Sequence, residues 1–160
     1  AILVTKCPLE ISTEERHRIV QKIAPTALQK VFFTKISYAP FVVSEFDQLP
    51  VASLRNYNVV LLTGIANPKP LLAYLTAQQV AFTHLSYPDH HSFDATDLQT
   101  IQKTFAAVEG EKKLLLTTEK DAVRLQGKIE GLYALGIQTD FIEGRKDFDT
   151  EIRNNIDSFY

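Results

Sequence analysis

Four apolar runs along this chain of 160 residues each end in a polar cluster, and each cluster is followed by a helix-like pattern. The clusters cover residues 5–8, 63–68, 87–91 and 117–121. Alternation of strand and helix favours an α/β fold with a mainly parallel sheet, in which all strands end at one edge and ligands bind at that edge. We therefore expect three layers, with helices on both faces of the sheet, and four clusters that converge on one site.

The predicted strands cover residues 2–4, 31–33, 59–62, 80–85, 114–116 and 132–135, the last of which is ended by Gly136. Residues 38–49 are expected to be irregular because Pro40 and Pro50 interrupt regular structure. We find no internal repeat and no linker, so we predict a single α/β domain over residues 1–160.

The helix starts are predicted from side chains that cap free N–H groups. These are Ser12 with Glu15, Asn67 before Pro68, Asp94 with Asp97, and Thr118 with Asp121. The first helix is expected to bury Ile19, Val20 and Ile23, and the last helix Phe148, Ile152, Ile156 and Phe159.

Composition excludes several classes of protein. The formal net charge of −2 gives no overall basic field, so we expect no nucleic-acid partner. Cys7 is the single cysteine, which rules out an internal disulfide. No apolar run reaches the length of a membrane-spanning helix. The chain begins directly in an apolar strand at Ala1, which indicates a piece of a longer protein.

The sharpest chemical signal is the tripeptide Asp89-His90-His91 at a predicted strand end. A carboxylate beside an imidazole can bind a divalent metal, or it can hold a histidine in one tautomer for proton transfer. It can also cap the following helix. Neighbouring residues of a strand point to opposite faces, so we expect His90 and His91 to act separately.

The other clusters offer a lysine and free backbone. Lys120 is expected in a first helical turn, where a cation opposes the helix dipole, so a phosphate or an acidic partner is one explanation and a solvated lysine the other. Gly64 allows a ligand to approach the main chain, and free N–H groups beside it suit an anion, although a structural turn is the plainer interpretation. Thr5 and Lys6 also follow a strand.

Several stretches together resemble the tetraacyldisaccharide 4'-kinase family. They are VLLTGIANP at residues 60–68, YPDHHSF at 87–93, LTTEKDAV at 116–123, VTKCP at 4–8 and VFF at 31–33. The resemblance covers nearly the whole chain. It implies that the chain is part of a P-loop kinase fold. It also implies a kinase that phosphorylates the 4'-hydroxyl of the tetraacyldisaccharide 1-phosphate precursor of lipid A. The family uses ATP and Mg²⁺ at the cytoplasmic face of the bacterial inner membrane.

The chain departs from that family because it contains no G-x-x-x-x-G-K-[ST] loop. The resemblance therefore implies the C-terminal portion of a kinase, with ATP, Mg²⁺ and the membrane surface contacted mainly by a missing N-terminal half. Phosphoryl transfer depends on positioned phosphates and metal, so we expect this portion to be inactive alone.

The resemblance also implies roles for individual residues. His90 is expected to orient or deprotonate the sugar hydroxyl as a catalytic residue, with Asp89 supporting it. The site that binds the substrate or its phosphate groups would be lined by Gly64, Asn67 and Lys120. Thr5 and Lys6 would lie near the nucleotide. Pro8 stands where related GTPases carry their guanine-reading acid, so guanine selectivity is not supported.

Two other interpretations remain open at this point. The first is a metal-dependent phosphoesterase of the Asp-His-His class, which needs several carboxylates from different strand ends. Asp89 and Asp121 are the only suitably placed candidates, so no metal ligand set is predicted. The second is a non-catalytic module that docks the rest of a kinase, which predicts an exposed apolar surface.

Overall fold

The structure is a computed structural model that describes residues 1–8 and 10–157, so the predicted inward position of Phe159 lies outside the described part. Its contacts form two compact units. The central unit comprises Tyr38–Gly136, and the terminal unit comprises Ala1–Ser37 with Ile137–Tyr160. Strands β2 (Val31–Val43) and β7 (Leu132–Phe141) each continue from one unit into the other. A single domain over the whole chain stays a prediction.

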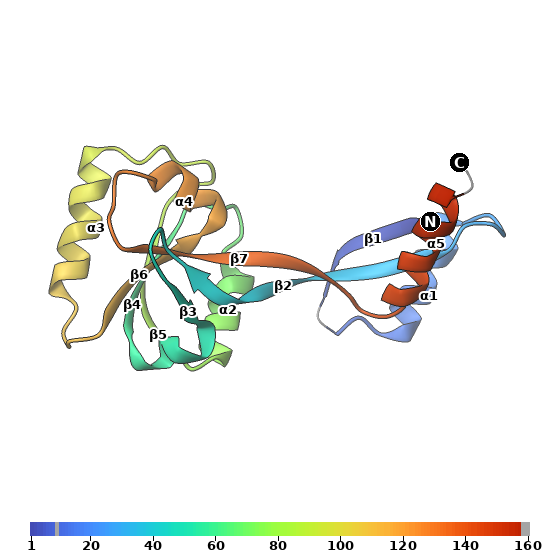
Figure 1. The fold of residues 1–160 in the computed structure, drawn as a ribbon, viewed down its shortest axis with the longest axis horizontal. Coiled ribbons are helices and arrows are strands. Elements are labelled where there is room, and N and C mark those ends of the chain that lie inside the picture. The colour runs from blue at the N-terminus through green and yellow to red at the C-terminus, as the bar shows by residue number, and fades with distance from the viewer. Residues whose placement is uncertain (9, 158–160) are drawn as a thin grey trace. The chain divides into compact units, whose positions relative to one another are not determined.

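A parallel sheet organises the central unit. Strand β4 (Asn58–Thr63) lies between β5 (Ala81–Ser86) and β6 (Lys113–Thr118), and β6 pairs in turn with β7, all in parallel (Figure 1). The pairing of β4 with β5 is unbroken over the full length of both strands. The carboxyl ends of these strands therefore share one edge, as the sequence predicted.

Both faces of this sheet are covered, because alternate residues of β4 belong to different cores. Val59 and Leu61 pack with residues of α2 (Lys69–Ala77) and of the 3-10 helix η1 (Val51–Asn56). Val60 and Leu62 pack with residues of α3 (Ala95–Ala107) and α4 (Glu119–Leu125). These four side chains are buried, and the burial of each stabilises the fold by about 1.5–3 kcal/mol. The predicted three-layer α/β architecture is confirmed here.

The helix starts follow the predicted capping residues in most cases. Asp94 and Asp97 form a complete capping box at α3, and Thr118 caps α4 by accepting the backbone N–H of Asp121. The cap of α2 is Pro68, one residue later than predicted, while the Asn67 side chain accepts the Lys69 N–H. On α4, Leu125 is buried and Val123 is exposed.

The terminal unit contains β1 (Ile2–Cys7) parallel to the first part of β2, with α1 (Thr13–Ile23) and α5 (Arg145–Asp157). The Ser12–Glu15 capping box is confirmed. Phe32 of β2 makes edge contacts with Phe141 and Phe148.

The predicted burial of the terminal helices is too strong. No residue of α1 or α5 is fully buried, and Ile23, Ile152 and Ile156 are exposed. The terminal unit is small, and small units bury a smaller fraction of their surface.

Two boundary predictions are wrong. Residues 38–43, expected to be irregular, continue β2 and pair with β3 (Gln48–Pro50), with Pro40 exposed on that strand. Proline is tolerated where its nitrogen has no ladder bond to make. Gly136 does not end β7 but lies within it, and its bare Cα leaves room for the Glu119 side chain, which would lie 2.8 Å from an added Cβ.

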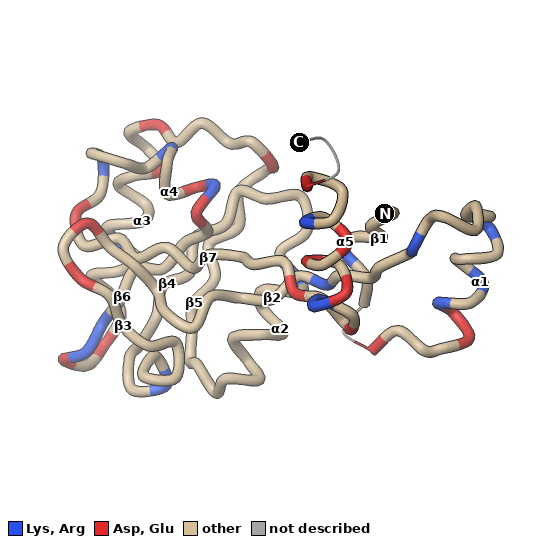
Figure 2. Tube along the Cα trace, turned by 45° about the vertical axis from the view of Figure 1, so that its right-hand side comes forward, with Lys and Arg blue, Asp and Glu red and all other residues tan. Residues whose placement is uncertain are grey.

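Charged residues of both signs are interspersed along the chain (Figure 2). This distribution agrees with the small net charge of the chain. Within the described residues, no helix has both the length and the apolar character needed to cross a bilayer.

Candidate functional site

Three of the four polar clusters meet at the carboxyl edge of the central sheet. The Gly64 N–H, after β4, donates to the Asp121 carboxylate of α4 at 2.8 Å. The Gly64 carbonyl accepts the backbone N–H of His90, from the loop after β5, at 3.2 Å. The Lys120 ammonium lies 3.3 Å from the His90 ring. The predicted convergence is therefore confirmed for the clusters after β4, β5 and β6.

Asp121 anchors this edge from inside. Its side chain is fully buried, and besides Gly64 it accepts the Thr118 hydroxyl at 2.9 Å and the Arg124 guanidinium at 3.0 Å. Its carboxylate is thus used between elements and does not complete the predicted capping box with Thr118. The Gly64 N–H is occupied by Asp121, so it is not available to an anion.

His90 sits in a strained turn. Its backbone φ is 59°, in the left-handed region that few non-glycine residues adopt, and such strain is typical of functional sites. Its N–H also contacts the Asp89 carboxylate at 3.0 Å, and the next N–H, of His91, returns to the Pro88 carbonyl. The imidazole itself is 72% exposed, so it is available to a ligand.

The His90 ring is surrounded by charged groups. Lys120 pairs with Asp89 at 2.9 Å, and this hydrogen bond is the main reason that the Asp89 pKa lies below its ordinary value. The Arg124 guanidinium lies 3.1 Å from Nδ1 of the ring. The sequence analysis missed Arg124, since an arginine on a helix surface carries no signal of its own. We call Asp89, His90, Lys120 and Arg124 the His90 cluster.

The two neighbouring histidines have other partners. His91 contacts the Asp97 carboxylate at 2.7 Å and stacks on the Tyr87 ring. The rings of His91 and His90 thus have different partners, and a turn, not strand alternation, separates them. His84 lies 2.8 Å from the Thr63 hydroxyl within the sheet, and burial lowers its pKa.

The remaining predicted site residues are not in the His90 cluster. Asn67 is exposed, and its bond to Lys69 lies within its own turn. Thr5 and Lys6 are exposed residues of β1 in the terminal unit, and Lys6 has a left-handed φ of 58°. Their proposed proximity to a nucleotide stays a prediction.

The described residues do not fit a divalent metal site. Over residues 1–8 and 10–157, no group of three His, Cys, Asp or Glu side chains is arranged to hold an ion. The two carboxylates that the phosphoesterase alternative requires are already engaged, Asp89 by Lys120 and Asp121 by three donors. That alternative is not supported.

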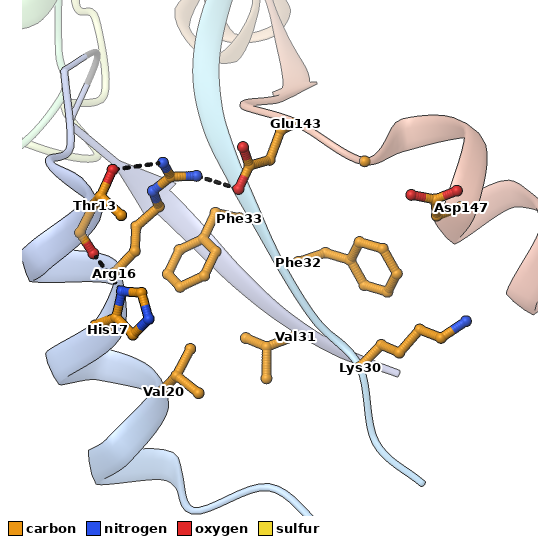
Figure 3. Close-up of a pocket in the computed structure, with 11 residues that line it drawn as sticks. Thr13, Arg16, His17, Val20, Lys30, Val31, Phe32, Phe33, Glu143 and Asp147 are labelled. Carbon is orange, nitrogen blue, oxygen red and sulfur yellow. Dashed lines mark hydrogen bonds and ion pairs between the residues drawn. The ribbon is translucent and has the colours of Figure 1, made fainter. Parts of the chain in front are cut away.

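A hollow of about 720 Å³ occurs in the terminal unit, and none of its lining residues belongs to the His90 cluster (Figure 3). The Arg16 side chain reaches from α1 toward Glu143, with which it forms an ion pair, and Phe32 and Phe33 lie beside it. Arg16 also keeps a buried Nε without a hydrogen-bond partner. No motif in the sequence indicated this hollow.

Comparisons with known proteins agree on one family. The family model described as tetraacyldisaccharide-1-P 4'-kinase (LpxK) matches residues 2–157. The chain is 36% identical to the tetraacyldisaccharide 4'-kinase of Flavobacterium johnsoniae, covering 97% of this chain and 44% of that protein. It is 33% identical to the enzyme of the same name from Bacteroides thetaiotaomicron, over 91% of this chain and 43% of that protein.

A solved structure has a similar fold. It is LpxK from Aquifex aeolicus in complex with ATP, with a TM-score of 0.53 and 19% identity, covering 94% of this chain and 50% of that one. This likeness supports the predicted kinase-like α/β fold. The chain spans less than half the length of the two relatives named above.

Proposed function

Because the chain belongs to the tetraacyldisaccharide 4'-kinase family, we propose that it forms part of a kinase that transfers a phosphoryl group from ATP to the 4'-hydroxyl of the tetraacyldisaccharide 1-phosphate precursor of lipid A. The observation that carries the proposal is the His90 cluster, an exposed imidazole flanked by a carboxylate and two cations at the carboxyl edge of the sheet. Ligands bind at that edge in open α/β sheets.

Each residue of the cluster has a role in this proposal. The His90 ring contacts the sugar hydroxyl and orients it for in-line attack, which supplies the positioning that phosphoryl transfer requires. Asp89 supports the ring from one side, and Lys120 holds Asp89 while offering positive charge toward a phosphate oxygen. Arg124 approaches the other side of the ring.

The nucleotide and its metal are held elsewhere in this proposal. The sequence contains no Walker-type loop, and the described residues do not fit Mg²⁺, so ATP and Mg²⁺ belong mainly to the portion of the family protein that this chain does not span. The same portion would contact the cytoplasmic face of the bacterial inner membrane. This chain alone is then expected not to turn over ATP.

A fusion protein tests the proposal. The N-terminal portion of the Flavobacterium johnsoniae enzyme is joined to this chain, and transfer of labelled phosphate from ATP to tetraacyldisaccharide 1-phosphate is measured. We expect product from the fusion, none from this chain alone, and a loss of about 100-fold or more in kcat for His90→Ala, the scale expected when a reacting group is no longer positioned.

The matched control is His17→Ala, which removes an exposed imidazole of α1. We expect the control to retain the activity of the unmodified fusion. Equal activity of His90→Ala and the unmodified fusion would refute the proposed role of the cluster. Robust turnover of ATP by this chain alone would refute the proposal that ATP and Mg²⁺ are bound mainly by the portion that this chain does not span.

A further inference from the structure

The Arg124 side chain connects the buried core of the site to the His90 ring. Its Nη1 donates to the fully buried Asp121 at 3.0 Å, and its Nη2 lies 3.1 Å from His90 Nδ1. Arg124 is itself only 23% exposed, and Nη1 also approaches the Gly64 carbonyl at 3.5 Å. The guanidinium is planar and rigid, so fixing Nη1 on Asp121 also fixes the direction of Nη2.

Arginine can only donate hydrogen bonds. A neutral imidazole has one protonated nitrogen and one acceptor nitrogen, and the hydrogen bond made by one nitrogen determines where the proton sits. A proton on His90 Nδ1 would face the N–H of Arg124 at 3.1 Å, with two donors opposed. A proton on Nε2 leaves Nδ1 free to accept from Arg124.

On the other side of the ring, Nε2 lies 3.6 Å from the second oxygen of the Asp89 carboxylate, which is too far for a hydrogen bond. Lys120 lies 3.3 Å from Nε2, but its shorter contact is the 2.9 Å bond to Asp89. Lysine is therefore oriented by the carboxylate, and Arg124 makes the shorter contact with the ring.

We propose that Arg124 is a positioning residue that holds neutral His90 in the tautomer with its proton on Nε2. Nε2 of this largely exposed ring then presents a hydrogen-bond donor. It suits an oxygen acceptor such as a carboxylate, a phosphate or a sugar oxygen. In the kinase, and resting there on the function proposed above, His90 would orient the substrate through this donor in the ground state.

The tautomer is measurable on this chain without ATP or substrate. The chain is labelled with ¹⁵N-histidine, and two-bond ¹H–¹⁵N correlation spectra are recorded at alkaline pH, where an ordinary histidine ring is neutral. The His90 signals are assigned by their loss in His90→Ala. We expect the pattern of a ring protonated at Nε2, and a pattern of protonation at Nδ1 in the unmodified chain overturns the proposal.

Variants at position 124 test whether Arg124 determines the tautomer of His90. Arg124→Met is expected to give a mixture of tautomers, and Arg124→Lys, which keeps a donor, to retain more of the Nε2 form. Arg55→Met, at an exposed arginine of η1, is the control and should leave the spectrum unchanged. Circular dichroism verifies folding of each variant. An unchanged His90 tautomer in folded Arg124→Met refutes the role of Arg124.

The fusion kinase separates this inference from the proposed function. We expect Arg124→Met to lower kcat roughly 10- to 100-fold, the range for residues that orient a functional histidine, with little change in KM for ATP. Loss of activity in His90→Ala with full activity in Arg124→Met would refute positioning by Arg124 while leaving the proposed function intact. Full activity in His90→Ala would refute the proposed role of the His90 cluster in the reaction, and the spectra would still decide the tautomer.

Discussion

Asp121 and Gly64 are hydrogen-bonded at 2.8 Å although they are 57 residues apart in the chain. The bond ties the start of α4 to the loop after β4, and the Asp121 carboxylate is fully buried. Asp121→Ala would leave the Gly64 N–H and the Thr118 hydroxyl without this acceptor. We expect a loss of roughly 3 kcal/mol in the free energy of unfolding, because buried polar groups would be left unpaired.

Urea denaturation followed by circular dichroism measures this loss. Glu130→Ala is the matched control, because Glu130 is an exposed acidic residue of the same unit. We expect the control to stay within about 0.5 kcal/mol of the unmodified chain, as is usual for surface substitutions. Equal stability of the two variants would show that the buried carboxylate does not anchor this edge.

Gly64 is expected to tolerate no side chain without displacing the site. An added Cβ would lie 3.1 Å from an Asp121 oxygen and 3.4 Å from the Pro88 carbonyl. Gly64→Ala should cost about 1–3 kcal/mol by overpacking and should shift the His90 ring signals in the ¹⁵N-histidine spectrum.

The comparison for Gly64→Ala is Gly127→Ala, where the backbone φ is +72° and nothing lies within 4 Å of an added Cβ. That variant is also expected to lose stability, by about 1 kcal/mol from backbone strain alone. Its His90 signals should stay in place. Identical spectra for both variants would contradict a close fit around Gly64.

The sequence was sufficient to predict that the polar clusters converge on one site, but not which side chains contact one another there. Parallel strands must end at one edge, so apolar runs followed by polar residues already indicated that Gly64, His90 and Lys120 would meet. Arg124 was missed because its partners, Asp121 and His90, are brought to it by the fold, and no local spacing encodes that contact.

The long strands were missed for a related reason. Proline and glycine usually interrupt regular structure, so Pro40 and Gly136 suggested the ends of strands. In the structure, Pro40 is exposed on β2, and Gly136 makes room for the Glu119 side chain against β7. Whether a proline or glycine breaks a strand depends on its neighbours in space, which a single sequence does not contain.

The Asp97 carboxylate predicts how stability changes in acid. Its pKa lies below the ordinary 3.8, chiefly because it accepts the Asp94 N–H and also the His91 ring. A carboxyl group whose pKa is lower in the folded state contributes stability above its unfolded pKa, and that contribution is lost as the pH falls through the folded pKa.

The stability advantage of the unmodified chain over Asp97→Asn should therefore be constant at pH well above 3.8 and shrink as the pH falls below that value. Urea denaturation at a series of pH values measures the difference. A difference that stays constant into strong acid would show that the Asp97 pKa is not lowered by folding.

Lys120 is expected to control the titration of Asp89. The bond between their side chains, 2.9 Å long, is the largest cause of the lowered Asp89 pKa. In Lys120→Met the ammonium is removed, so the Asp89 pKa should rise relative to the unmodified chain. The carboxyl ¹³C signal of Asp89, followed by NMR as a function of pH, measures the shift, and Lys103→Met, at an exposed lysine of α3, should leave it in place. Superimposable Asp89 titrations in the unmodified chain and Lys120→Met would mean that the two side chains do not pair in solution, and the positive charge beside His90 would then be free to swing away from the site.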